Sequence, residues 1–146
     1  MPPQTPVCRT AQLRLSVDGR DGDFNGMSHS STEISVRNVG RDCTLPASPG
    51  IAIRDARGRI MASGTAPGRT KAAIRLGGGH RAAADLRWVS APVYPRNRRI
   101  RSDRVTVHWS GATLHAALAA VLYGPAARPL TFDQAPLRVM AGAAAD

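Results

Sequence analysis

Residues 12–17 read QLRLSV, and the alternation in this stretch decides the fold class. Leu13, Leu15 and Val17 fall on one face of an extended strand, and the polar residues between them fall on the other. The same two-residue period recurs in three further stretches: EISVRN at 33–38, AAADLRW at 82–88 and VTVHW at 105–109. One apolar and one polar face per strand is typical of antiparallel sheets that enclose a single core. The sequence therefore predicts an all-β protein.

Turn residues between the apolar stretches predict how the strands are joined. Asp55 can begin a turn and Gly58 can adopt the left-handed conformation, so the flanking segments GIAIR and RIMAS predict a hairpin. AAIRL at 72–76 and RAAADLRW at 81–88 predict another pair of strands around the glycine turn GGGH. Residues 90–104 contain two prolines and a run of charges, which predicts a long surface crossing.

The C-terminal part of the chain contains one stretch with helical periodicity, residues 113–123. Its apolar side comprises Leu114, Leu118, Val121 and Leu122, and Gly124 follows in the position of a C-cap. A final strand is expected in APLRVM, and residues 141–146 are expected to form a disordered tail. Residues 1–140 are thus predicted to form one immunoglobulin-like antiparallel β-sandwich domain with one short C-terminal helix.

Length and charge narrow the classes of protein. The 146 residues are enough for one domain and one core. The formal net charge is +10, carried by 19 arginines and a single lysine, Lys71. No segment approaches the roughly 18–20 apolar residues that a membrane-spanning helix needs, so no membrane span is expected. The start of the chain as given, MPPQTPVC, has neither the charged nor the apolar region of a signal peptide.

The two cysteines, Cys8 and Cys43, precede the first predicted strand and follow the second. Neither lies in a C-x-x-C pair or near a histidine at zinc spacing, so no metal site is expected there. A disulfide between them would close a loop of about 36 residues and stabilise the fold by roughly 4 kcal/mol. We predict this bond, and with it an oxidising compartment, and two unrelated buried thiols are the alternative.

These cysteines and strands resemble a known group of bacterial secreted or lipoprotein domains of unknown function. The resembling pattern runs through Cys8, LRLSV, GMSHSS, RNVG with Asn38 and Gly40, CTL with Cys43 and Leu45, the hairpin IAIRDARGRI, and ADLRW with Trp88. The resemblance implies an exported β-sandwich, secreted or periplasmic. It implies no catalytic residues.

Residues 21–26, DGDFNG, are similar to the first half of an EF-hand calcium loop. The twelfth position of such a loop is a glutamate, but here it is Thr32, and the flanks predict strands where the motif requires helices. His29 and Met27 could hold soft copper, but two ligands do not make a site. We therefore predict neither a metal site nor a cofactor.

The remaining chemistry favours a protein that is not an enzyme. The sequence has no G-x-S-x-G element, and most of its carboxylates fall in predicted turns. Trp88 and Trp109 end strand patterns that face the core, so we expect them to pack there and not to contact a ligand.

The segment YPRNRRIRSDR contains five arginines in a predicted surface loop, Arg96, Arg98, Arg99, Arg101 and Arg104. An arginine guanidinium group can bind phosphate or sulfate with two hydrogen bonds at once. This segment therefore predicts salt-dependent binding of a polyanion such as lipopolysaccharide, anionic lipid or nucleic acid. Sequence-specific recognition of nucleic acid is not expected, because no helix is available to enter a groove. The alternative is a loop that is only solvated.

The sequence as a whole predicts an exported, monomeric, non-enzymatic module of the bacterial envelope with a binding or structural role. Its partner is an unidentified protein or an envelope polyanion. The alternative function is a polyanion-binding protein that acts through residues 96–104.

Overall fold

The computed structural model describes residues 5–17, 23–24, 28–66 and 70–140 of the chain. The strands in these residues are, in chain order, β1 (Leu13–Val17), β2 (Asp23–Phe24), β3 (His29–Asn38), β4 (Cys43–Pro46), β5 (Gly50–Arg54), β6 (Ile60–Thr65), β7 (Ala73–Leu76), β8 (Arg81–Val89), β9 (Asn97–Arg101), β10 (Arg104–Trp109), β11 (Ala112–Ala117), β12 (Val121–Pro125), β13 (Leu130–Gln134) and β14 (Arg138–Val139). A 3-10 turn, η1 (Thr10–Gln12), precedes β1. The predicted all-β class is confirmed.

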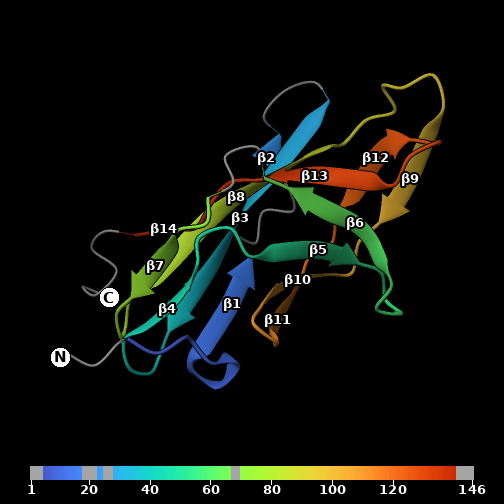
Figure 1. The fold of residues 1–146 in the computed structure, drawn as a ribbon. Helices are drawn as coiled ribbons and strands as arrows, with labels where there is room; N and C mark the ends of the chain where they lie inside the picture. The colour runs from blue at the N-terminus through green and yellow to red at the C-terminus, as the bar shows by residue number, and fades with distance from the viewer. Residues whose placement is uncertain (1–4, 18–22, 25–27, 67–69, 141–146) are drawn as a thin grey trace.

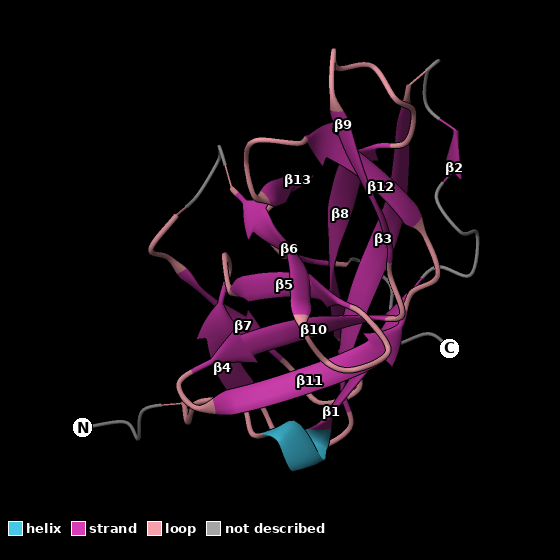
Figure 2. Cartoon of the chain, turned by 90° about the vertical axis from the view of Figure 1, so that its right-hand side faces the viewer, coloured by secondary structure: helices cyan, strands magenta, loops and turns pink. Residues whose placement is uncertain are grey.

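One large sheet dominates the fold and has the strand order β1-β3-β8-β13-β6-β5-β10-β11 (Figure 1). The pairs β9–β12 and β4–β7 form two separate small sheets. The large sheet curls until its end strands, β1 and β11, lie against each other (Figure 2). The named strands pair antiparallel throughout the described residues except for β6 and β13, which run parallel, so the large sheet is mixed. The result is a sandwich or barrel-like arrangement around one core.

The alternation seen in the sequence produces the core. Ile34 and Val36 of β3 lie opposite Ala84 and Ala82 of β8, and all four side chains are fully buried. On β3 the residues between them are less buried, as the two-residue period predicts, whereas on β8 Ala83 between the two alanines is also fully buried. Trp88 and Trp109 are also buried in this core, where the sequence places them.

The predicted hairpin is confirmed in β5 and β6, which pair antiparallel across residues 55–59. Gly58 has a φ of 81°, a left-handed conformation that glycine adopts without strain. The Asp55 carboxylate accepts hydrogen bonds from the backbone N–H groups of Arg57 and Arg59, each at 2.9 Å. The aspartate and the glycine together therefore close this turn.

The helix predicted for residues 113–123 is wrong, because this segment forms β11 and β12. Leu114 and Leu118 are four residues apart, and that spacing puts two side chains on the same side of a helix and of a strand alike. Pairing decides between them, since β11 runs along β10 with Leu114 opposite Val107. Leu114 and Leu122 are buried on β11 and β12, and Leu118 is buried in the connection between the two strands. Gly124, expected as the helix C-cap, lies within β12.

Two further expectations about connections are wrong, and one strand was not expected. Residues 97–101 of the predicted surface crossing form β9, which pairs with β12. The strands β7 and β8 exist as predicted, but β7 pairs with β4 and β8 pairs with β3. The strand β13 was not predicted, and it occupies a central position between β8 and β6.

The last expected strand is reduced to β14, and the predicted tail, residues 141–146, lies outside the described residues. In the part of the chain that the structure describes, no helix is long and apolar enough to cross a membrane.

Candidate functional site

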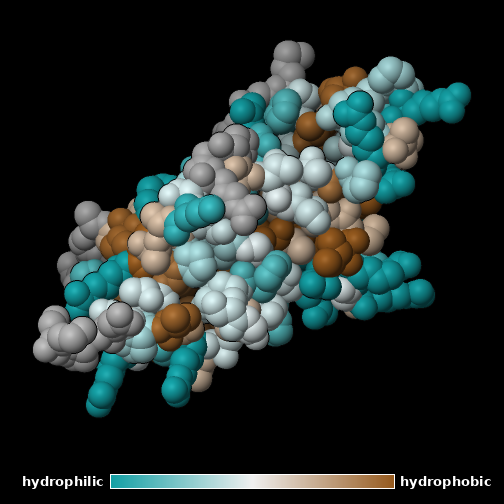
Figure 3. All heavy atoms as spheres, in the orientation of Figure 1, coloured by the Kyte–Doolittle hydropathy of each residue, from teal (hydrophilic) through white to brown (hydrophobic). Residues whose placement is uncertain are grey.

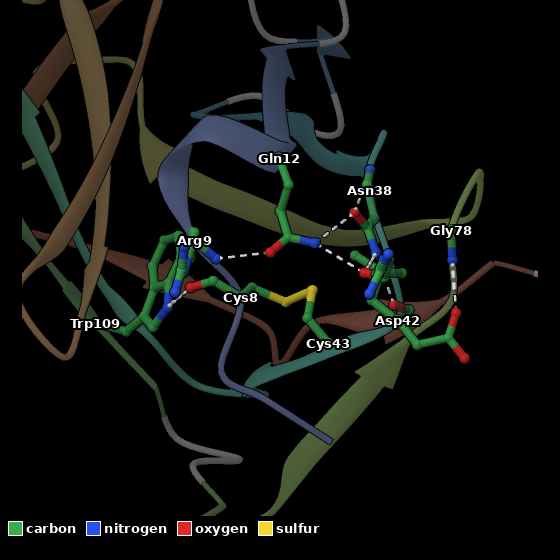
Figure 4. Close-up of a disulfide and its surroundings, with 11 residues drawn as sticks. Cys8, Arg9, Gln12, Asn38, Asp42, Cys43, Gly78 and Trp109 are labelled. Carbon is green, nitrogen blue, oxygen red and sulfur yellow. Dashed lines mark hydrogen bonds between the residues drawn. A yellow bond between two sulfur atoms is a disulfide. The ribbon is translucent and has the colours of Figure 1, made fainter. Parts of the chain in front are cut away.

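The predicted bond between Cys8 and Cys43 is present, and both cysteines are buried. The Cys8 N–H donates to the carbonyl of Thr44 in β4 at 2.8 Å, so the N-terminal segment is both bonded and hydrogen-bonded to that strand. The Trp109 indole N–H donates to the Cys8 carbonyl at 3.3 Å (Figure 4). Cys8 thereby connects the N-terminal segment, β4 and β10.

Asn38 lies beside the disulfide at the end of β3, where its side chain is fully buried and fully hydrogen-bonded (Figure 4). Its amide N–H groups donate to the carbonyls of Arg41 and Leu76 at 2.8 and 2.9 Å. Its carbonyl accepts from the Gln12 amide and the Gly40 N–H at 3.0 and 2.9 Å. The motif Asn-x-Gly thus joins η1, β3 and β7 in one polar network.

The five arginines proposed for polyanion binding do not share one surface. Arg98, Arg99 and Arg101 are exposed on β9, where alternation puts Arg99 and Arg101 on one face and Arg98 on the other. Arg96 precedes β9 and is exposed. Arg104 begins β10 and forms an ion pair with Asp103 at 3.4 Å.

Arg101 also lies near the turn between β5 and β6, across a shallow hollow of 570 Å³ that is lined by Arg57 and Arg59 as well. Asp55 and Asp103 line the same hollow. In Figure 3, hydrophilic side chains project both over this turn and over the end of the molecule that carries β9 and β12. The positive surface is therefore broader than the predicted loop, and it is divided by carboxylates.

A more enclosed hollow lies where β8, β12 and β13 meet. It measures 620 Å³ and contains Trp88, Tyr94, Tyr123 and Phe132. These are four of the protein's six aromatic residues. Its polar lining comprises His29, Arg87, Arg128, Thr131 and Asp133. We call this hollow the aromatic groove.

The aromatic groove continues into a neighbouring hollow of 670 Å³ on the other side of a ridge. Tyr94, Pro125 and Arg128 line both hollows, and Arg96 lines the second. The pairing of β12 with β9 therefore places one arginine of the predicted basic segment at the far end of a cleft rather than on a flat patch.

Among the described residues, two carboxyl groups have shifted pKa values, and both lie in turns away from the groove. The Gly78 N–H, followed by the Arg75 guanidinium, lowers the pKa of Asp42. The Arg59 N–H and side chain lower the pKa of Asp55. Each carboxylate is thus held ionised by the turn that it closes.

No group of three or more potential metal ligands occurs in the described part of the chain. The half calcium motif at residues 21–26 and Met27 fall mainly outside the described residues, which include only Asp23 and Phe24 from that stretch. The prediction that this loop binds no calcium tightly therefore stays a prediction.

Residues 8–141 match the model of a protein family described as a domain of unknown function, DUF4232. The chain belongs to this family. The match begins at Cys8 and spans both cysteines and the entire aromatic groove. Comparisons with curated proteins and with solved structures find no match. The coarser of the sequence expectations, a family of domains of unknown function, is confirmed.

The sequence indicated the disulfide but not the aromatic groove. In the sequence, Tyr94 begins the arginine-rich segment, Tyr123 ends the segment predicted as a helix, and Arg87 falls on the polar side of the alternation in AAADLRW. The groove residues come from segments as far apart as β3 and β13. The one available signal was scarcity, because in a chain with six aromatic residues each of them needs an explanation.

Proposed function

We propose that this member of the family is an exported, non-enzymatic module of the bacterial envelope with a binding role. The observation that carries the proposal is the buried Cys8–Cys43 bond. Disulfides of this structural kind persist in oxidising compartments and are rare in the cytosol of mesophiles. The bond also anchors the N-terminal segment to β4, so it contributes to the fold and is not a free surface pair.

The distribution of titratable groups favours binding over catalysis. Catalytic acids and bases are commonly shifted in pKa and lie together in a cleft. Here the two shifted carboxyl groups, Asp42 and Asp55, are hydrogen-bonded within separate turns. The concave surface near β12 instead gathers aromatic rings and arginines, which are residues of recognition.

The location and the bond are tested together in the native bacterium. Intact mass should be measured on protein from the cytosol, the envelope and the medium, alkylated before and after reduction. We expect the protein in the envelope or medium, with no alkylation before reduction. Cytosolic protein with two alkylated thiols would contradict export.

Polyanion binding through residues 96–104 is the second candidate function. Its support is the exposure of Arg98, Arg99 and Arg101 on β9, since exposed guanidinium groups can pair with phosphate or sulfate. The net charge of +10 would add long-range attraction for an anionic polymer.

Salt dependence tests this second candidate. Binding of DNA, heparin-like glycans or anionic vesicles should fall together between about 50 and 200 mM salt. Replacing Arg98, Arg99 and Arg101 with alanine should flatten that dependence. A parent protein that binds none of these polymers at low salt, or a triple variant that binds them all unchanged, excludes the candidate.

A further inference from the structure

Two arginines line the aromatic groove, and within the described residues their guanidinium groups are unpaired. Arg87 of β8 and Arg128, which precedes β13, both line the groove. Neither guanidinium makes a hydrogen bond or an ion pair with a described residue, although Asp133 lies opposite Arg87 in the pairing of β13 with β8. By contrast, Arg54 and Arg81 are hydrogen-bonded within the fold. Two unpaired guanidinium groups beside one concave surface favour an anionic ligand, because each can bind a carboxylate or phosphate with two N–H groups.

The aromatic residues of the groove favour a ligand with a ring-shaped body. Trp88 and Phe132 are buried, and Tyr94 and Tyr123 are half-buried at its wall. Neither tyrosine hydroxyl has a hydrogen-bond partner among the described residues, so both are available to a ligand. The volume of 620 Å³ lies in the range of small-molecule sites, about 300–1,000 Å³.

The remaining groups of the lining suit hydroxyl groups on that ring. Asp133 can accept hydrogen bonds, and at present its carboxylate accepts one from the Thr65 hydroxyl at 3.2 Å. His29 and Thr131 can each donate or accept. A saccharide combines these properties, since one side of its ring presents C–H groups to the negative face of an aromatic ring while its edge carries hydroxyls.

The neighbouring hollow favours more than one sugar unit. It is reached across the ridge of Tyr94, Pro125 and Arg128, and Arg96 lines its far side. Along the cleft, arginine therefore recurs at three places: Arg87, Arg128 and Arg96. A chain of sugars that carries repeated negative charges matches this repetition.

We propose that the aromatic groove binds an acidic oligosaccharide, with sugar rings against Tyr94 and Tyr123 and their anionic groups at Arg87 and Arg128. Of the five arginines in the basic segment, Arg96 lines the neighbouring hollow, whereas Arg98, Arg99 and Arg101, which the polyanion test replaces, line neither hollow, so the two proposals can fail independently. The aromatic groove would recognise a sugar ring and a negative charge together, whereas the exposed arginines of β9 would recognise negative charge alone.

Calorimetric titration with a galacturonic acid trisaccharide tests the proposal. We expect saturable binding with a Kd of about 1 mM or lower, and at least roughly tenfold weaker binding of the neutral maltotriose. Inorganic phosphate alone should bind weakly, because it has no ring. Binding should also change the tryptophan fluorescence, since Trp88 lies in the groove.

Three arginine variants locate the binding. Arg87→Gln and Arg128→Gln should each lower the affinity about tenfold or more, because each removes hydrogen bonds to a charged group. Arg41→Gln makes the same change of charge at an exposed position outside the groove and should leave the affinity unchanged. The double variant Arg99→Ala/Arg101→Ala should also bind the trisaccharide as the parent does. Thermal unfolding shows which variants fold. If either Arg87→Gln or Arg128→Gln does not fold, the affinity of the other variant tests the proposal.

Several outcomes overturn the proposal. These are the absence of saturable trisaccharide binding up to about 10 mM, equal binding of maltotriose, and an equal loss of affinity in Arg41→Gln and Arg87→Gln. The last result would mean that the protein's net charge, and not the groove, attracts the sugar.

Discussion

The two ends of the molecule are built in opposite ways (Figure 1). At the end that carries β4 and the disulfide, buried polar groups such as the Asn38 amide are fully hydrogen-bonded. At the end that carries β9 and β12, arginines and tyrosines lie at the surface, and several of them have no partner in the described residues. Buried, satisfied networks stabilise a fold, while unpaired groups in a cleft are available for binding. The comparison separates the part that holds the fold from the part that we expect to bind.

Removal of the disulfide should cause the largest loss of stability. Cys8→Ser with Cys43→Ser frees a loop with a sequence separation of 35 residues. We expect the free energy of unfolding to fall by about 2–5 kcal/mol. Urea denaturation of the double variant and the parent measures it, and a loss below about 1 kcal/mol would mean that the two ends differ less than the structure indicates.

Asn38→Ala should cause the next largest loss, at the same end. It removes four hydrogen bonds, and the buried Leu76 carbonyl loses the donor that Asn38 supplies. We therefore expect the free energy of unfolding to fall by about 2–4 kcal/mol.

Asn97 offers a matched control for Asn38 at the opposite end. Its half-buried side chain makes two hydrogen bonds to the backbone of Tyr94, at 3.1 and 2.7 Å. Asn97→Ala should cost only about 1 kcal/mol in the same denaturation experiment. Equal costs for the two variants would remove the distinction between the ends.

Acidification should weaken the disulfide end through Asp42. Its folded pKa lies below the ordinary value of 3.8 because the Gly78 N–H and Arg75 bind the carboxylate. The ionised group therefore stabilises the folded state above that value, and this contribution is lost as the pH falls through the lower folded pKa. The parent should be more stable than Asp42→Asn at pH 7, and the gap should close below about pH 4. A gap in unfolding midpoint that is independent of pH would argue against this role.

The smallest effect on stability is expected at β9. Replacing the exposed residues Arg98, Arg99 and Arg101 with alanine should change the free energy of unfolding by less than about 0.5 kcal/mol. Thermal and urea denaturation measure it. A loss similar to that of Asn38→Ala would show that β9 supports the fold and is not a free surface.

The sequence predicted what depends on local period and missed what depends on pairing. The strands β1, β3, β8 and β10 follow from alternation, and the Asp55–Gly58 turn follows from two residues with specific turn preferences. Segment 113–123 misled because its leucine spacing suits a helix and a strand equally, and only the neighbouring β10 selects the strand.

The strand β13 had a readable signal, since Leu130, Phe132 and Gln134 alternate with Thr131 and Asp133. No sequence signal indicated its parallel pairing with β6 or its central position, because the paired residues are nearly seventy positions apart and local sequence patterns do not contain such pairings. The aromatic groove was missed for the same reason, since its walls come from β3, β8, β12 and β13. The arginines were visible as a cluster in sequence, but alternation along β9 distributes them over two faces.

The position of β13 also sets the order in which the protein can fold. This strand lies between β6 and β8 in the middle of the sheet, yet in sequence it follows every other strand of the path from β1 to β11. Until it arrives, the facing edges of β6 and β8 have unpaired backbone groups that can pair with another chain. Contacts between residues this distant in sequence form slowly. The chain is therefore most prone to aggregate while β13 is missing from the sheet, and a truncation before Leu130 would make that vulnerable state permanent.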